Sequence, residues 1–301
     1  LYGHSCKITI SLPDLFSNLD KMIELNNLTF SYTKKGVPAL LDLNGRIEPG
    51  IHLLAGENGA GKTTLLHLLA GVALPSAGTI SINGTNPATD SPADKGNTFL
   101  LEENTSFPLK TIRKFAEVHS PFYPNFSNKR FCDNLIAFGL TGDEPMKSMS
   151  LGTRKKALLA YALALGVDTL LLDEPTNALD IQSKEILKTL IAQNISDNQT
   201  LIISTHTVSE LENLFDGALM MAKGALLWAG TEQELTDRLA FEKSRTPDPD
   251  ALYTEPRLGH FLSILPAVDG EPTNVDWRLL YSALHSPKCN DVLNILKTKK
   301  R

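Results

Sequence analysis

Alternating and continuous apolar runs mark strands in the first third of the chain. Residues 22–30 alternate between apolar and polar types, residues 41–47 form a second strand pattern, and residues 51–55 are a short, mainly apolar run. These patterns predict three strands, the last of the buried type. Residues 79–84 alternate again and end in Asn-Gly, a turn signal of antiparallel strands. The sequence therefore predicts an antiparallel β edge subdomain next to a buried strand.

Later apolar runs predict the rest of a sheet. Residues 169–172 are mainly apolar, with three consecutive leucines, and end at two acidic residues, and residues 201–204 begin with three apolar residues and form the next strand pattern. Apolar positions at helical spacing over 186–191 predict an amphipathic helix between them. Segments 218–222 and 225–229 flank a Lys-Gly pair and predict a closing hairpin. Strands that alternate with helices predict an α/β fold with a mainly parallel sheet.

A helical segment interrupts this alternation. Apolar residues fall at helical spacing in 112–118 and 131–138, and four prolines between residues 105 and 149 punctuate the segment. The pattern continues as a long helix over 152–165. We predict a small α-helical subdomain over about residues 105–165.

The two ends of the chain read differently from the segment between them. A strand pattern starts directly at Met22, so residues 1–21 are predicted to be an N-terminal extension. Residues 22–230 are predicted to form the main domain, and residues 231–301 a C-terminal extension. Its basic end, 297–301, is either a solvated terminus or a contact with anionic lipid.

Shorter signals predict details of the last third. Thr207 with Glu210, and Thr231 with Glu234, each have the spacing of a capping box and predict two helix starts. Residues 245–250 contain two prolines and two aspartates, and are predicted to be a linker.

The composition, with 42% hydrophobic and 21% charged residues, is typical of an ordinary soluble protein. A net charge of −5 argues against nucleic-acid binding, which usually requires a basic surplus. Three distant cysteines suit a reducing compartment and offer no zinc spacing. The longest apolar stretch, 157–172, is interrupted and shorter than the roughly 20 residues that span a bilayer. We therefore expect no secretion and no membrane span in this chain.

One stretch carries a specific chemistry. Residues 56–64 follow a predicted strand, precede an apolar helix and match the pattern G-x-x-x-x-G-K-[ST]. Its glycines let backbone N–H groups point at phosphate oxygens, whereas the alternative is a plain glycine-rich turn with a surface lysine. Lys62 would reach the β- and γ-phosphates, and Thr63 would offer its hydroxyl to Mg²⁺. The predicted phosphate-binding residues are Gly56, Glu57, Asn58, Gly59, Ala60, Gly61, Lys62, Thr63 and Thr64.

Two adjacent carboxylates end the strand at 169–172. Burying charge is costly unless a cation compensates, so this position favours chemistry over the alternative of an exposed acidic turn. Asp173 is predicted to hold Mg²⁺, and Glu174 to polarise an attacking water. Tyr32 follows the first strand and is either a ring that stacks on a nucleotide base or a core or edge tyrosine.

In this order the motifs resemble those of the ATP-binding cassette (ABC) family over residues 22–230. Residues 173–180, DEPTNALD, resemble its Walker B motif and D-loop, and His206 in Ser-Thr-His resembles its switch histidine. Tyr32 falls where the family has its adenine-stacking aromatic. Residues 149–153, MSLGT, stand in the place of the LSGGQ signature.

The resemblance implies which residues work on ATP. It implies a P-loop NTPase core with Lys62, Glu174 and His206 in catalytic roles. It also implies that Ser150 and Gly152 of the signature bind nucleotide across a dimer interface. Leu151 and Thr153 depart from the signature, and Glu102 stands where the family's Q-loop glutamine falls, which makes it a predicted metal ligand. Both departures are similar to those of ABC-2 type exporters.

The implied activity is hydrolysis of ATP, bound together with Mg²⁺. The chain would be the subunit that powers a separate transmembrane permease, and the transporter would be an exporter. The implied partners are that permease and a second cassette. Membrane contact is expected only through the permease, on the cytoplasmic side. The alternatives are a cytosolic non-transport ABC ATPase and a regulatory cassette with weak turnover. A translation-type relative usually has two cassettes, and a repair-type relative has a long coiled-coil insertion, but this chain has neither.

Overall fold

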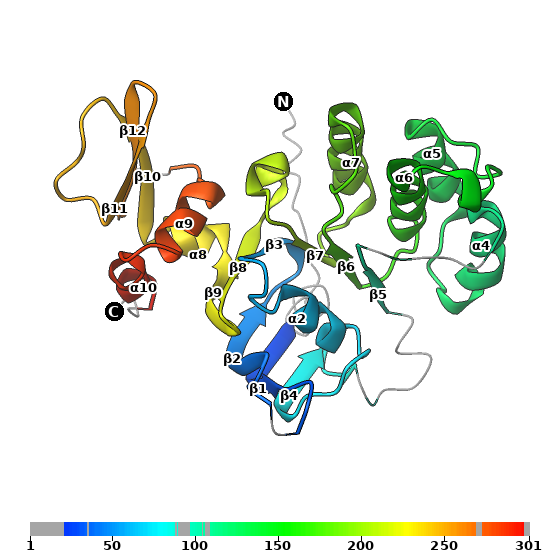
Figure 1. Ribbon diagram of the computed structural model, residues 1–301, viewed down its shortest axis with the longest axis horizontal. Coiled ribbons are helices and arrows are strands. Elements are labelled where there is room, and N and C mark those ends of the chain that lie inside the picture. Colours follow the sequence, from blue (N-terminus) through cyan, green and yellow to red (C-terminus); the bar gives the residue numbers. More distant parts are fainter. Residues whose placement is uncertain are drawn as a thin grey trace, which may run out of the picture.

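The computed structural model describes residues 21–34, 36–87, 89, 97–103, 105, 109–268 and 273–297. The predicted N-terminal extension, apart from Lys21, lies outside the described residues. Figure 1 shows an antiparallel sheet below a central sheet, with a helical subdomain and a C-terminal module at opposite ends of the long axis.

A six-stranded sheet forms the centre of the molecule, in the order β5-β6-β7-β3-β8-β9. Its first five strands are parallel, and β9 is antiparallel to β8, so the predicted closing hairpin is confirmed. The turn between β8 and β9 has positive φ at Lys223 and Gly224, as a two-residue hairpin turn requires. The strands are β3 (Gly50–Gly56), β5 (Thr98–Leu101), β6 (Thr169–Asp173), β7 (Thr200–Ser204), β8 (Gly217–Ala222) and β9 (Ala225–Thr231).

The predicted edge subdomain is a separate three-stranded antiparallel sheet. It consists of β1 (Ile23–Phe30), β2 (Leu40–Ile47) and β4 (Ala77–Ile82), with β1 in the middle. Asn83 and Gly84 both have positive φ, and the bridge from Ile82 to Thr85 closes the turn that the Asn-Gly pair predicted.

The helical subdomain is confirmed as a group of short helices. It contains α4 (Ile112–His119), α5 (Asn128–Ala137), α6 (Leu151–Ala162) and the short 3₁₀ turns Ser120–Phe122 and Met146–Ser148. Thr111, Ser127 and Ser150 cap the three helices by accepting hydrogen bonds from backbone N–H groups. The helix predicted over 152–165 ends three residues earlier, at Ala162.

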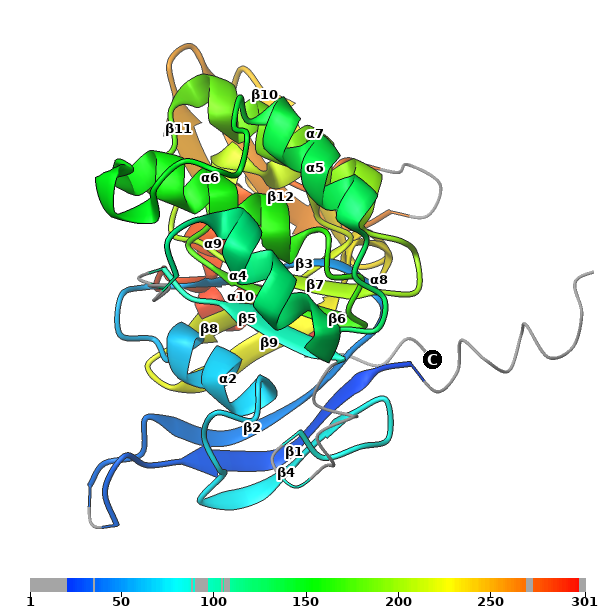
Figure 2. The same ribbon diagram turned by 90° about the vertical axis from the view of Figure 1, so that its right-hand side faces the viewer.

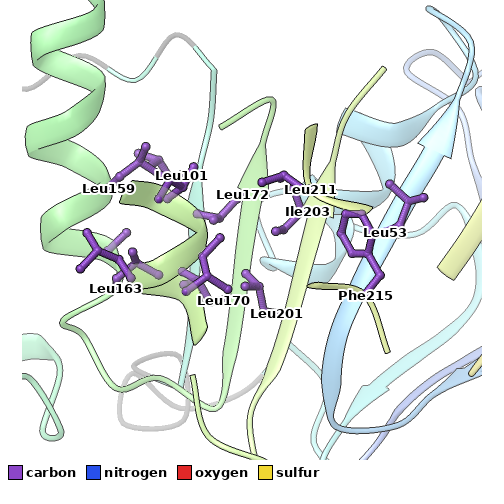
Figure 3. Packing of buried hydrophobic residues seen from close by; sticks show 14 of the residues in the cluster. Leu53, Leu101, Leu159, Leu163, Leu170, Leu172, Leu201, Ile203, Leu211 and Phe215 are labelled. Atoms are coloured by element: carbon purple, nitrogen blue, oxygen red, sulfur yellow. The ribbon is translucent and has the colours of Figure 1, made fainter. Parts of the chain in front are cut away.

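The inner strands of the central sheet have apolar residues at successive positions because the sheet separates two hydrophobic cores. Leu170 and Leu172 face a core shared with α6 and α7 (Ile181–Asn194), and Figure 3 shows the packing on this side. Leu171 and Ile202 face the other core, with α2 (Lys62–Leu69) and the antiparallel sheet. Figure 2 shows these two layers on opposite sides of the central sheet. A sheet covered on both faces needs apolar residues at every position.

The C-terminal residues form a packed module rather than an irregular tail. A three-stranded antiparallel sheet in the order β10-β12-β11 lies next to helices whose buried residues include Trp277 and Leu280. Its elements are α8 (Glu232–Thr236), β10 (Leu239–Ser244), β11 (Tyr253–Arg257), β12 (His260–Pro266), α9 (Trp277–Leu284) and α10 (Cys289–Lys297). The linker predicted at 245–250 is wrong, because this segment connects β10 to β11 within one module.

Only one of the two capping boxes forms. Thr231 and Glu234 make the reciprocal hydrogen bonds at the start of α8, so that prediction is confirmed. The prediction at Thr207 is wrong, since its side chain makes no cap and only the 3₁₀ turns Val208–Glu210 and Glu212–Leu214 follow. The Glu210 carboxylate accepts from Lys184 Nζ at 2.5 Å instead. No helix in the described part of the chain is long and apolar enough to cross a bilayer.

Candidate functional site

The phosphate loop connects β3 to α2 through backbone that needs glycine. Gly59 and Gly61 have φ of 81° and 103°, in the left-handed region. A Cβ at Gly61 would lie 2.5 Å from Leu40 Cδ2, and one at Gly56 would lie 2.7 Å from the Met221 carbonyl. The loop therefore fits against β2 and β8 only without side chains at these two positions.

Lys62 begins α2 and is almost fully buried. Its Nζ donates to the carbonyls of Gly56 at 2.8 Å and Glu57 at 3.3 Å, so the ammonium lies inside the curve of the loop. Burial lowers the pKa of Lys62, and the nearby carboxylates of Glu174 and Asp173 oppose this effect. A desolvated cation in this place is suited to phosphate oxygens.

Two strand ends and the start of α2 hold Asp173. Asp173 and Ser204 pair in register across the parallel strands β6 and β7. Thr63 Oγ1 donates to Asp173 Oδ2 at 2.8 Å, and Ser204 Oγ donates to Oδ1. The Asp173 carboxylate is thus fixed within reach of the loop.

Glu174 has an unusual backbone and an oxygen without a hydrogen-bond partner among the described residues. Its φ is 46°, and its N–H donates to the Ser204 carbonyl at 3.1 Å. Its Oε2 is buried and has no hydrogen-bond donor among the described residues. His206 Nδ1 lies 3.0 Å from that oxygen, but the pair does not make a hydrogen bond. A buried oxygen without a donor fits a group supplied from outside the chain, such as water or substrate.

These groups surround one cavity of about 490 Å³, a size suited to a small ligand. Tyr32 lies at its edge, 69% exposed, with its hydroxyl 2.7 Å from Thr64 Oγ1 and its ring edge-on to Phe30. Many of the site residues predicted from the sequence line this cavity, and they are Tyr32, Asn58, Gly59, Gly61, Lys62, Thr63, Thr64, Asp173, Glu174 and His206.

The sequence singled out Glu102 and missed its neighbour. Glu102 does not line the cavity, and its Oε1 lies 2.6 Å from His67 Nε2. Glu103 lines the cavity, and its Oε1 accepts from Asn177 Nδ2 at 2.6 Å. Glu103 and Asn177 are cavity-lining residues that only the fold brings together, although Asn177 lies within the DEPTNALD motif.

The signature residues lie outside this cavity. Ser150 is exposed and caps α6, accepting from Thr153 N at 3.1 Å. A Cβ at Gly152 would lie 2.5 Å from the Ala178 carbonyl, so glycine is needed where α6 meets the D-loop. Leu151 is 62% exposed. The chain therefore does not bring its own signature to its own phosphate loop.

The oxygen atoms that could ligate a metal in this cavity fit a magnesium–nucleotide complex. The Thr63 hydroxyl and the Asp173 carboxylate are hard oxygen donors 2.8 Å apart. Among the described residues no group of three or more His, Cys, Asp or Glu could hold a metal unaided. Such a two-ligand site suits Mg²⁺, which commonly takes its other ligands from water and substrate phosphates.

Comparison with known proteins gives one family. The ABC transporter family profile matches residues 40–177. YybJ of Bacillus subtilis (strain 168), an uncharacterized ABC transporter ATP-binding protein, is 32% identical over 208 residues, 68% of this chain and 94% of that protein. ThiQ of Escherichia coli O157:H7, a thiamine import ATP-binding protein, is 29% identical over 227 residues, 71% of this chain and 94% of its own. A dimeric bacterial ABC transporter cassette of known structure has a TM-score of 0.60 at 22% identity, over 69% of this chain and 98% of that one.

The fold and the cavity define a P-loop ATPase, and the predicted fold class is confirmed. The chain belongs to the ATP-binding cassette family, as an ATP-binding subunit of the ABC transporter class with ATPase activity.

Proposed function

We propose that this chain binds ATP with Mg²⁺ in the cavity and hydrolyses it to power a separate transmembrane exporter subunit. The observation that carries the proposal is the convergence of the phosphate loop, the Thr63–Asp173 pair and a Glu174 carboxylate oxygen without a hydrogen bond on one cavity. Phosphoryl transfer depends on positioning and charge stabilisation, which are the properties that these groups supply.

Each residue has a role that follows from its place. The loop N–H groups and Lys62 bind the phosphates, and Tyr32 stacks on the base from the cavity edge. Thr63 and Asp173 would hold Mg²⁺, which neutralises phosphate charge when bound. Glu174 Oε2 accepts a proton from the attacking water. His206, whose Nδ1 lies 3.0 Å from that oxygen, reaches toward the γ-phosphate and holds the attacking water in place.

The site is completed by a second cassette. Ser150 and Gly152 stand outside the cavity, at the start of α6. In the proposed dimer, each α6 N-terminus meets the ATP of the partner, so that nucleotide joins two copies head to tail. A helix N-terminus favours the negative γ-phosphate.

The proposed membrane partner is a separate permease, which this subunit meets on the cytoplasmic side. The described helices include none that spans a bilayer, which is in keeping with a peripheral subunit. Export is proposed from the pattern at Glu102, Leu151 and Thr153, which is similar to that of ABC-2 type exporters. ThiQ is an import protein by name, and a transport assay in vesicles of known orientation distinguishes export from import for this chain.

The permease is tested by affinity purification. We expect a tagged full chain, extracted from membranes of its own organism with mild detergent, to bring down one integral membrane protein in stoichiometric amount. Magnesium-ATP should then be hydrolysed faster by the complex than by the subunit alone. A chain that stays in the soluble fraction without such a partner, yet hydrolyses ATP, would instead indicate a non-transport ABC ATPase.

A further inference from the structure

Lys155 is a buried cation that the proposed mechanism does not use. It lies on α6, five residues after the capping Ser150, and is only 4% exposed. Lysine is rarely buried without a partner, because the ammonium loses its hydration. The burial of Lys155 therefore requires nearby groups that compensate its charge.

The surroundings of Lys155 supply the compensating charge. Its Nζ donates a long hydrogen bond, 3.5 Å, to the Glu103 backbone carbonyl. Burial lowers the pKa of Lys155, and the carboxylates of Glu103, Asp173 and Glu174 oppose this by attracting the charged form.

Lys155 lies behind the cavity wall rather than in it. Glu103, Asp173, Glu174 and Asn177 line the cavity, whereas Lys155 does not. The Glu103 carboxylate is in turn held by Asn177 Nδ2 at 2.6 Å. One cation thus lies beside the backbone of one lining segment, and the negative charges of Asp173 and Glu174 favour its charged form.

We infer that Lys155 is a positioning residue that holds the Glu103 backbone, and with it this part of the cavity wall, in place for hydrolysis. Lys155 lies on α6, the helix that begins at the signature residues. It therefore also connects the helix that would meet the partner's ATP to the cavity of its own chain. The inference rests on the proposed hydrolysis at Glu174.

Two further contacts show how closely α6 is joined to the cavity wall. Gly152 lies against the Ala178 carbonyl, and Lys156 Nζ donates to Asp180 Oδ2 at 3.1 Å. The first turns of α6 therefore contact the D-loop, which directly follows Asp173 and Glu174. A shift of Ser150 on dimer formation would reach the Glu103 segment of the cavity wall through Lys155.

Lys155→Met tests the inference, since Met has similar length but neither charge nor donor. We expect kcat for ATP to fall about 10- to 100-fold, as for a misplaced catalytic group. KM for ATP and the ADP affinity, measured by calorimetry, should change by less than about threefold, because Lys155 does not line the cavity. Tm should stay equal or rise, because an apolar side chain avoids the cost of the buried charge.

The matched control is Lys129→Met on α5, whose side chain is 87% exposed and which should keep kcat and Tm. A kcat of Lys155→Met within twofold of the wild-type value overturns the inference, as does a fall in Tm that accounts for the lost activity. If the Met variant does not fold, Lys155→Gln serves the same purpose. It should lose less kcat than the range above because its amide can still donate, and unchanged kcat overturns the inference. A wild-type chain that hydrolyses no ATP would instead contradict the proposed function.

Discussion

Glu174→Gln is expected to reduce the rate of ATP hydrolysis by about 100- to 1,000-fold while leaving ATP binding within about threefold of the wild-type affinity, as loss of a general base does. Glutamine keeps the shape of the side chain and its place at the end of β6. It cannot take a proton from water, so the step that fails is hydrolysis rather than binding.

The measurement is steady-state phosphate release together with binding of a fluorescent ATP analogue. Glu185→Gln is a suitable control, because it makes the same chemical change on the exposed surface of α7. Hydrolysis at the wild-type rate in Glu174→Gln would show that another group acts as the base.

The same variant also reports on the dimer. When hydrolysis is blocked, bound ATP persists, so sedimentation at saturating magnesium-ATP should show a dimer that ADP does not support. A strict monomer under these conditions would contradict the head-to-tail arrangement for the isolated subunit.

The phosphate loop and the two carboxylates were predictable because their signals are local. A buried strand, a glycine-rich turn and an apolar helix follow one another within residues 51–69. Asp173 ends β6 directly after three leucines, Glu174 follows it, and β6 lies in the parallel part of the sheet beside β7. The carboxyl ends of neighbouring parallel strands meet at one edge, which brings Asp173 to Ser204 without further information.

The choice between Glu102 and Glu103 was not predictable in the same way. Side chains alternate in direction along β5, but that strand ends at Leu101. Beyond it, direction depends on the loop backbone and on partners distant in the sequence: His67 for Glu102, and Asn177 for Glu103. A spacing rule alone does not distinguish two adjacent glutamates.

The C-terminal module shows a different limit. Its strands are short and half-buried, so their pattern is mixed, and only pairing with β12 gives them a shared apolar face. Prolines at 247 and 249 correctly mark a loop, but a loop inside a sheet and a linker between domains have the same composition.

Mixing two inactive variants is expected to restore hydrolysis if the site is shared between copies. Lys62→Met removes the cation from the phosphate loop. Ser150→Asp keeps a good N-cap for α6 but adds a carboxylate that repels the partner's γ-phosphate. Each variant alone should retain less than about 1% of the wild-type rate, since each removes charge stabilisation from both sites.

A mixed dimer would have one site with both lesions and one with neither. Random pairing of equal amounts makes half of the dimers mixed, so the mixture should reach about a quarter of the wild-type rate. Mixing Lys62→Met with a chain that carries both changes should restore nothing, because no intact site can form. If the first mixture is no more active than its components, the phosphate loop and the signature do not act on the same ATP. If the mixture regains activity, the second cassette explains why Ser150 lies outside the cavity of its own chain.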